Sequence, residues 1–231
     1  MTEATLFFRE FTRTRRATGA VAPSSPRLAR ALTRYVIPSP GTARAVLEVG
    51  PGTGAVTRHV MESLGPMDTL DLVEANPRFA ALLAQTYAGD RRVRVLTGLV
   101  QDADLGSYDT IVCGLPFANF DAATVGDILG RLVGALRPGG TMSYFAYAGM
   151  PPLRRALATG RARARVLALQ SVIGRVLARH RFRTETVLGN LPPARVHHLA
   201  PAVPAAEALA LGACASPPGG GETAAREGAG L

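Results

Sequence analysis

The stretch Val46-Leu-Glu-Val-Gly-Pro-Gly-Thr-Gly54 decides the fold of this chain of 231 residues. It follows a short apolar run and precedes a stretch of helical periodicity near residues 56–64. Glycine at 50, 52 and 54 lets the backbone turn sharply and approach a ligand at points where any Cβ would collide. Spaced glycines also occur in plain turns, but between a strand and a helix they are typical of a cofactor loop. The stretch therefore predicts such a loop at the carboxyl end of a buried strand.

Outward from this loop, short apolar runs alternate with helical stretches. Strands are predicted at residues 45–49, 69–73, 93–96, 110–113, 141–146, 183–188 and 195–199. Helices are predicted at residues 26–35, 56–64, 77–87, 123–136 and 153–179. This alternation predicts βαβ units and an α/β fold with a doubly wound parallel sheet.

Composition divides the chain into three parts. Residues 1–35 are expected to hold an amphipathic helix, a loop and a cap helix, and residues 36–200 the cofactor-binding domain. Residues 201–231, rich in Ala, Gly and Pro, are predicted to be a disordered tail. The first helix, residues 2–16, has an apolar stripe opposite several arginines, so it either packs on the domain or lies on a membrane surface.

Positive charge is concentrated in one segment. The chain has 26 basic and 17 acidic residues, a net charge of +9, and every basic side chain that is not His is Arg. Residues 151–183 contain nine arginines and no acid. A general compositional bias toward Arg and Ala explains part of this pattern. A concentrated basic face also predicts binding to phosphate groups, either of nucleic acid or of an anionic membrane.

The two cysteines, Cys113 and Cys214, exclude a disulfide framework and fit a reducing compartment. Charges interrupt the first eleven residues, so no signal peptide is expected there. Apolar runs fall short of the ~18–20 residues that a transmembrane helix needs. His197 and His198 have no acid or Cys at metal-ligand spacing, so no metal site is expected. The predicted location is cytoplasmic, peripheral to a membrane.

Two carboxylates indicate which cofactor the loop holds. Glu74 ends the second predicted strand, 24 residues after Gly50, where a carboxylate can accept both hydroxyls of a ribose. Glu48, directly before the glycines, would repel a pyrophosphate but suits a ligand that carries an amino group and a sulfonium charge. These charges favour S-adenosylmethionine over NAD.

Several segments together resemble the bacterial phospholipid N-methyltransferases, which are class I S-adenosylmethionine-dependent methyltransferases. The resemblance covers residues 6–200 and rests on Thr18-Gly-Ala-Val-Ala-Pro-Ser-Ser25, the glycine loop, Val73-Glu74, Gly114-Leu-Pro-Phe-Ala-Asn-Phe120, Leu136-Arg-Pro-Gly-Gly140 and Asn190-Leu-Pro-Pro-Ala-Arg-Val196. It implies a Rossmann-like sheet with an antiparallel last strand, and methylation of the phosphatidylethanolamine amine toward phosphatidylcholine. It implies the cofactor-binding residues Glu48, Gly50, Gly52, Thr53, Gly54 and Glu74. The family commonly has Asp after Gly98, where this chain has Leu99, so Asp102 is the candidate replacement at the adenine.

Methyl transfer to an amine needs orientation of the nitrogen and removal of its proton. Tyr147, Tyr144 and Asn119 are the polar residues predicted nearest the strand ends and are the catalytic candidates. Phe117 and the tyrosine rings can face a cationic amine, although core packing is the alternative for each. Arg195 is the candidate for binding the lipid phosphate, an ordinary surface ion pair being the alternative.

Other functions remain open. Gly114-Leu-Pro-Phe117 resembles the Asn-Leu-Pro-Tyr/Phe signature of rRNA adenine dimethyltransferases, but Gly114 lacks the side chain that would bind the adenine amine. Nucleic acid is therefore a disfavoured partner, and a phospholipid at an anionic membrane surface is the predicted one. A small-molecule methyltransferase or a non-catalytic lipid-binding protein are the further alternatives, since fold does not fix substrate.

Overall fold

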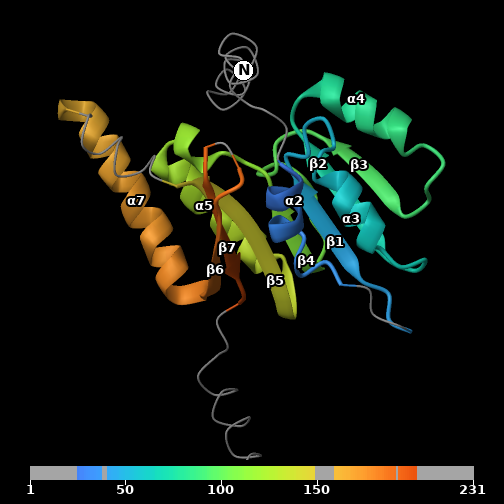
Figure 1. The fold of residues 1–231 in the computed structure, drawn as a ribbon. Coiled ribbons are helices and arrows are strands. Elements are labelled where there is room, and N and C mark those ends of the chain that lie inside the picture. Colours follow the sequence, from blue (N-terminus) through green and yellow to red (C-terminus); the bar gives the residue numbers. More distant parts are fainter. Residues whose placement is uncertain (1–24, 38–40, 149–158, 191, 202–231) are drawn as a thin grey trace, which may run out of the picture. The chain divides into compact units, whose positions relative to one another are not determined.

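Seven strands form one sheet in the order β3-β2-β1-β4-β5-β7-β6 (Figure 1). The computed structural model describes residues 25–37, 41–148, 159–190 and 192–201. The strands are β1 (Ala45–Val49), β2 (Thr69–Glu74), β3 (Val93–Thr97), β4 (Tyr108–Cys113), β5 (Leu136–Tyr147), β6 (Arg181–Val187) and β7 (Ala194–Leu199). β1 to β5 run parallel, and β7 runs antiparallel to both β5 and β6. The predicted α/β class and the antiparallel last strand are confirmed.

The strand order reverses at β1. The chain moves from β1 to β2 and β3 on one side, then returns to β4 and β5 on the other. Gly50 N donates to Val73 O at 2.9 Å, and Gly114 N donates to Val49 O at 2.8 Å, so the loops after β1, β2 and β4 are tied together. In open α/β sheets this reversal is where ligands bind, outside the carboxyl ends of the strands.

Helices cover both faces of the sheet. α2 (Pro26–Leu32), α3 (Thr57–Ser63) and α4 (Pro77–Thr86) pack on one face. α5 (Ala122–Gly134) packs on the other, with α7 (Gly160–His180) against it. Three side chains cap helices where the sequence supplies Ser, Asn or Asp: Ser25 Oγ accepts from Leu28 N, Asn76 Oδ1 from Arg78 N and Asp121 Oδ1 from Thr124 N. The predicted doubly wound arrangement follows from these two layers.

Two apolar clusters lie on opposite faces of the sheet. Alternate residues of each central strand enter opposite clusters: Leu47 and Val49 of β1 pack toward α5, and Val46 packs toward α2 and α3. On α7 the apolar residues Leu169 and Ile173 pack against the α5 cluster. Its arginines are exposed, and α7 has no fully buried residue.

The predicted boundary between the helix at residues 123–136 and the strand at residues 141–146 is wrong. Apolar spacing carried the helix over residues 123–136, but α5 ends at Gly134 and β5 already begins at Leu136. Tyr108 N donates to Ala135 O at 2.8 Å, and Tyr108 is paired with Leu136, so β4 draws this backbone into the sheet. The predicted helix over residues 2–16, the first six residues of the predicted helix 153–179, and the tail from residue 202 lie outside the described residues.

Candidate functional site

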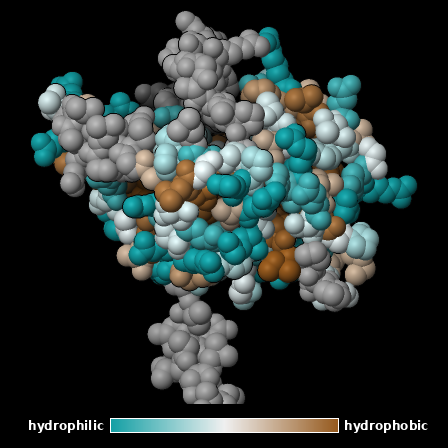
Figure 2. All heavy atoms as spheres, viewed as in Figure 1, coloured by the Kyte–Doolittle hydropathy of each residue, from teal (hydrophilic) through white to brown (hydrophobic). Residues whose placement is uncertain are grey.

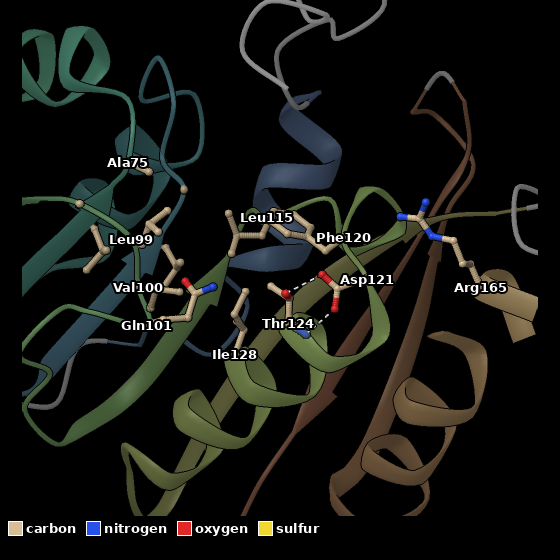
Figure 3. Close-up of a pocket in the computed structure, with 14 residues that line it drawn as sticks. Ala75, Leu99, Val100, Gln101, Leu115, Phe120, Asp121, Thr124, Ile128 and Arg165 are labelled. Carbon is tan, nitrogen blue, oxygen red and sulfur yellow. Dashed lines mark hydrogen bonds between the residues drawn. The ribbon is translucent and has the colours of Figure 1, made fainter. Parts of the chain in front are cut away.

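A cavity of about 450 Å³ lies at the carboxyl ends of β1 to β4, where the strand order reverses (Figure 3). Its size is within the range of cofactor pockets. It is lined by Val49, Gly50, Val73, Ala75, Gly98, Leu99, Val100, Gln101, Leu115, Phe120, Asp121, Thr124, Ile128 and Arg165. The loop after β3 forms one side of the cavity, and the start of α5 together with α7 forms the other (Figure 3).

The glycine loop takes the conformation that its sequence predicts. Gly50, Gly52 and Gly54 have φ angles of 70°, 60° and 81°, which side chains with a Cβ rarely adopt. A Cβ on Gly50 would lie 2.8 Å from Leu115 Cδ2, and one on Gly114 would lie 2.9 Å from Gly50 O. Glycine at these positions therefore keeps the space between β1 and β4 narrow and lets the backbone of Gly50 line the cavity.

Glu74 is held beside this loop. It is buried, its Oε2 accepts from Gly52 N at 2.9 Å, and its Oε1 accepts from Asn76 N at 2.8 Å. Its chain neighbours Val73 and Ala75 both line the cavity. A carboxylate oxygen has more than one acceptor direction, so each can also take a ribose hydroxyl. Glu74 itself does not line the cavity, and its role at the ribose stays a prediction.

Glu48 carries an unsatisfied polar atom. Its side chain is 2% exposed, and within the described part of the chain its Oε2 has no hydrogen-bond partner. Burial raises its pKa to about 8, the nearby Thr57 hydroxyl partly offsets this effect, and the charge of Glu74 adds to it. Glu48 does not itself line the cavity. A cation bound above β1 would stabilise the ionised form of Glu48, so its chemistry fits S-adenosylmethionine, which carries two cationic groups.

The loop after β3 presents a different polar residue from the one predicted. Leu99, Val100 and Gln101 line the cavity, and Figure 3 shows the Gln101 amide directed into it. Asp102 is exposed, its N–H bonds Leu99 O at 3.1 Å, and it does not line the cavity. Sequence reasoning missed Gln101, although it is the first polar side chain after Leu99.

The two candidate catalytic tyrosines lie on opposite faces of β5. Tyr144 is 1% exposed in the α5 cluster and meets Phe117 edge-on at 5.3 Å between ring centroids. Tyr147 packs with Phe145 at 5.4 Å toward the other cluster. Burial raises the pKa of Tyr144, so its hydroxyl stays protonated at neutral pH and is no general base there. Residues three apart in a strand face opposite sides, and the sequence already held this signal.

Apart from Gly50, the predicted site residues do not line the cavity. Thr53 and Arg195 are exposed, on the glycine loop and on β7 respectively. Asn119 is half-buried in the short 3₁₀ helix η1 (Phe117–Asn119), directly before the lining residues Phe120 and Asp121.

The histidine pair belongs to a different part of the sheet. His198 is buried, and its ring nitrogens bond Ser143 Oγ at 2.8 Å and Glu185 Oε1 at 3.0 Å. This network joins β5, β6 and β7. Among the described residues no group of three or more His, Cys, Asp or Glu side chains is arranged to hold a metal.

Two charged residues of the cavity were not predicted. Asp121 was not singled out, and Arg165 was one of nine arginines in a basic segment. Asp121 has a recognisable signal, since it follows the Leu-Pro-Phe-Ala-Asn-Phe segment and caps α5. Arg165 has none, because its place over the cavity depends on how α7 packs on α5.

Two of the segments that resemble the phospholipid N-methyltransferases, the first and the last along the chain, are in contact. Ser25 N donates to Asn190 Oδ1 at 3.4 Å, and Asn190 Nδ2 donates to Pro192 O at 2.8 Å. Ala148 N, just after β5, donates to Pro193 O at 2.7 Å. These contacts place Ser25, Asn190 and Pro193 beside the carboxyl end of β5.

Comparison with known proteins agrees with this geometry. Residues 47–142 match the family described as methyltransferase domain. The chain is 32% identical over 145 residues to ornithine lipid N-methyltransferase of Singulisphaera acidiphila, covering 60% of this chain and 74% of that protein. It is 34% identical over 87 residues to ribosomal RNA small subunit methyltransferase A of Geobacter sulfurreducens, covering 34% of this chain and only 30% of that one.

The solved structures support the fold. N-methyltransferase NodS from Bradyrhizobium japonicum, in complex with S-adenosyl-L-homocysteine, aligns with a TM-score of 0.57 at 16% identity, over 75% of this chain and 87% of that one. TrmN from Thermus thermophilus aligns with a TM-score of 0.54 at 17% identity, over 75% of this chain and 48% of that one. The glycine loop, the buried acid at the end of β2 and the cavity agree with the match to a lipid methyltransferase. This chain therefore belongs to the class I S-adenosylmethionine-dependent methyltransferases.

Proposed function

We propose that the chain transfers methyl groups from S-adenosylmethionine to the primary amine of a membrane lipid. Phosphatidylethanolamine is the proposed acceptor, and ornithine lipid is the second candidate. The observation that carries the proposal is the match over 74% of the length of an ornithine lipid N-methyltransferase.

The cavity supports this chemistry. S-adenosylmethionine bound there would supply a methyl carbon open to nucleophilic attack and a neutral thioether as the leaving group. The chain must then orient the amine and let it lose its proton, so that its lone pair can form the N–C bond. Glu74 and the loop around Gly50 are proposed to hold the cofactor, and Gln101 the adenine. Because Asp121 is exposed, solvent reaches that end of the cavity and can accept the amine proton.

The rings of Phe117 and Tyr144 are proposed to border the amine. They lie on the same face of the sheet as the cavity, in the cluster that includes the lining residues Phe120 and Ile128. An aromatic face attracts a cationic amine by ~0.5–2 kcal/mol. Tyr147 and Asn119 remain proposals for orientation from the carboxyl ends of β5 and β4.

An rRNA substrate is disfavoured by the space beside Gly114. The signature of the adenine enzymes has Asn at this place, but a Cβ here would lie 2.9 Å from Gly50 O and 3.4 Å from Val49 O, both backbone atoms. This backbone leaves no room for the side chain that binds the adenine amine. The matches to the ribosomal enzymes also cover about a third of their length.

A membrane surface is the proposed place of action. No helix among the described residues is long and apolar enough to cross a membrane. On the face drawn in Figure 2, hydrophobic residues form small separate patches among hydrophilic ones. Among the described residues, the exposed arginines of α7 are therefore the proposed contact with the membrane. Electrostatic attraction to anionic lipid contributes about 1 kcal/mol for each arginine near the surface. The amphipathic segment 2–16 is the proposed second contact.

The experiment offers three acceptors separately to the protein with labelled S-adenosylmethionine: phosphatidylethanolamine liposomes, ornithine lipid liposomes and small-subunit rRNA. Thin-layer separation should show label in methylated lipid and none in RNA. A Glu74→Ala variant serves as the control for cofactor-dependent labelling. Label in rRNA adenine, or in neither lipid, contradicts the proposal.

A further inference from the structure

Opposite charges stand at one end of an otherwise largely apolar cavity. Leu99, Val100 and Ile128 line its interior, whereas Asp121 and Arg165 are the two ionisable residues among the described residues that line it. The charged pair lies on the side formed by α5 and α7, away from the loop after β3 (Figure 3). The cavity therefore separates an apolar end, suited to the adenine, from a charged end that is free for the acceptor.

The carboxylate of Asp121 is held in one orientation. Its Oδ1 accepts from Thr124 N at 2.9 Å, and its Oδ2 accepts from Thr124 Oγ1 at 2.7 Å. These bonds keep the pKa of Asp121 below its usual value, so the group is ionised at neutral pH. Because Asp121 is exposed, it can bind an incoming ammonium without first losing a protein partner.

The guanidinium of Arg165 extends from α7 toward the Phe120 and Asp121 side of the cavity (Figure 3). Within the described part of the chain it makes no ion pair or hydrogen bond. Other arginines do: Arg94 binds Asp71, and Arg137 binds Asp109. A fork of five donors without a partner, at the wall of a cavity, suits a phosphate or carboxylate of the ligand.

We propose that Asp121 and Arg165 together select a zwitterionic headgroup, with Asp121 binding its ammonium and Arg165 binding its anionic group. The inference rests on the proposed function and names the substrate class of the same site. In phosphatidylethanolamine the anion is a phosphate, and in ornithine lipid it is a carboxylate. Arg165, and not the predicted Arg195, is then the anion-binding residue, because Arg195 does not line the cavity.

The test measures KM and kcat for each lipid in micelles of a neutral detergent, which remove the attraction of α7 to an anionic surface. The variants are Arg165→Gln, Arg165→Lys and Asp121→Asn. Asn still caps a helix, so Asp121→Asn removes the charge but keeps the start of α5. The matched controls are Arg78→Gln on α4 and Asp127→Asn on α5; both residues are exposed and outside the cavity lining.

We expect Arg165→Gln to raise KM about tenfold or more for the lipid that is the substrate, since one charge-assisted hydrogen-bonding partner is lost. Arg165→Lys should recover part of this loss, and Asp121→Asn should raise KM similarly. Both control variants should keep the wild-type KM. Calorimetric binding of S-adenosylhomocysteine should stay within about twofold in all variants. Dodecylamine, an ammonium without an anion, should inhibit wild type and Arg165→Gln equally or inhibit neither.

The outcomes separate the two claims. Wild type that methylates a lipid, with Arg165→Gln no different from Arg78→Gln, overturns the headgroup inference alone. Equal weakening of lipid and dodecylamine binding by Arg165→Gln also overturns it, because the residue then does not read the anion. Wild type that methylates neither lipid removes the proposed function, and the inference with it. If the KM effect is confined to one lipid, that lipid is the source of the anion.

Discussion

Replacing Glu48 by Gln should change how the stability of the cofactor-free protein depends on pH. The Glu48 carboxyl is buried with an unsatisfied oxygen, and its pKa is raised to about 8 from 4.5. A carboxyl whose pKa is raised by folding does not reduce stability below pH 4.5, because it is then protonated in both the folded and the unfolded protein. As pH rises from 4.5 to 8, the unfolded chain ionises first and stability is lost. A difference of this size corresponds to about 5 kcal/mol when fully expressed.

The Glu48→Gln variant keeps the shape of the side chain and cannot ionise. Relative to wild type, we expect it to gain about 1 kcal/mol at pH 5 and about 4 to 5 kcal/mol at pH 8.5 from this effect. Urea unfolding at both pH values measures the difference, with the slope m checked for constancy. Glu62→Gln, on the exposed side of α3, is the control for the substitution itself.

Bound cofactor should have the opposite effect on the stability difference between the two proteins. A bound cation near Glu48 favours the ionised carboxylate, so S-adenosylmethionine should stabilise wild type more than Glu48→Gln at pH 8.5. A stability difference between the two proteins that stays constant from pH 5 to pH 8.5 would refute the reasoning, because the carboxyl would then have an ordinary pKa despite its burial.

Three further changes have defined outcomes. Glu74→Ala should weaken calorimetric binding of S-adenosylmethionine about tenfold or more, because each hydrogen bond to a charged acceptor is worth ~1.5–3 kcal/mol; unchanged affinity in a folded variant contradicts the cofactor site. Gly114→Asn should lower the melting temperature, measured by calorimetry, because its Cβ meets Gly50 O at 2.9 Å; a wild-type melting temperature would show that the loops are not closely packed. Deleting residues 1–16 should reduce sedimentation with anionic liposomes while cofactor affinity falls less; undiminished sedimentation would assign this segment to packing.

The sequence predicts the sheet well because its strands are apolar runs bounded by breakers. The run 45–49 is β1 as predicted, and β2 and β3 extend one residue beyond their predicted ends. The end of α5 was misplaced because Leu136 continues the apolar spacing of Leu132, whereas pairing with β4 decides its conformation. Such pairing joins residues 28 apart and has no local signal.

The cofactor half of the site was more predictable than the acceptor half. Gly50 directly follows β1 and Glu74 ends β2 within one βαβ unit, so the local pattern places them. Gln101 and Arg165 depend on loop conformation and on how α7 packs on α5, which composition does not encode. The opposite orientation of Tyr144 and Tyr147 was available from strand periodicity alone.

The most direct test of the central claim is the mass spectrum of lipids after incubation of the full chain with S-adenosylmethionine and mixed liposomes of phosphatidylethanolamine and ornithine lipid, with rRNA in the same reaction. The proposal predicts one or more methyl groups on the amine of a lipid, none on RNA, and no product from Glu74→Ala. Methylated adenine in the rRNA with unmodified lipids would contradict it.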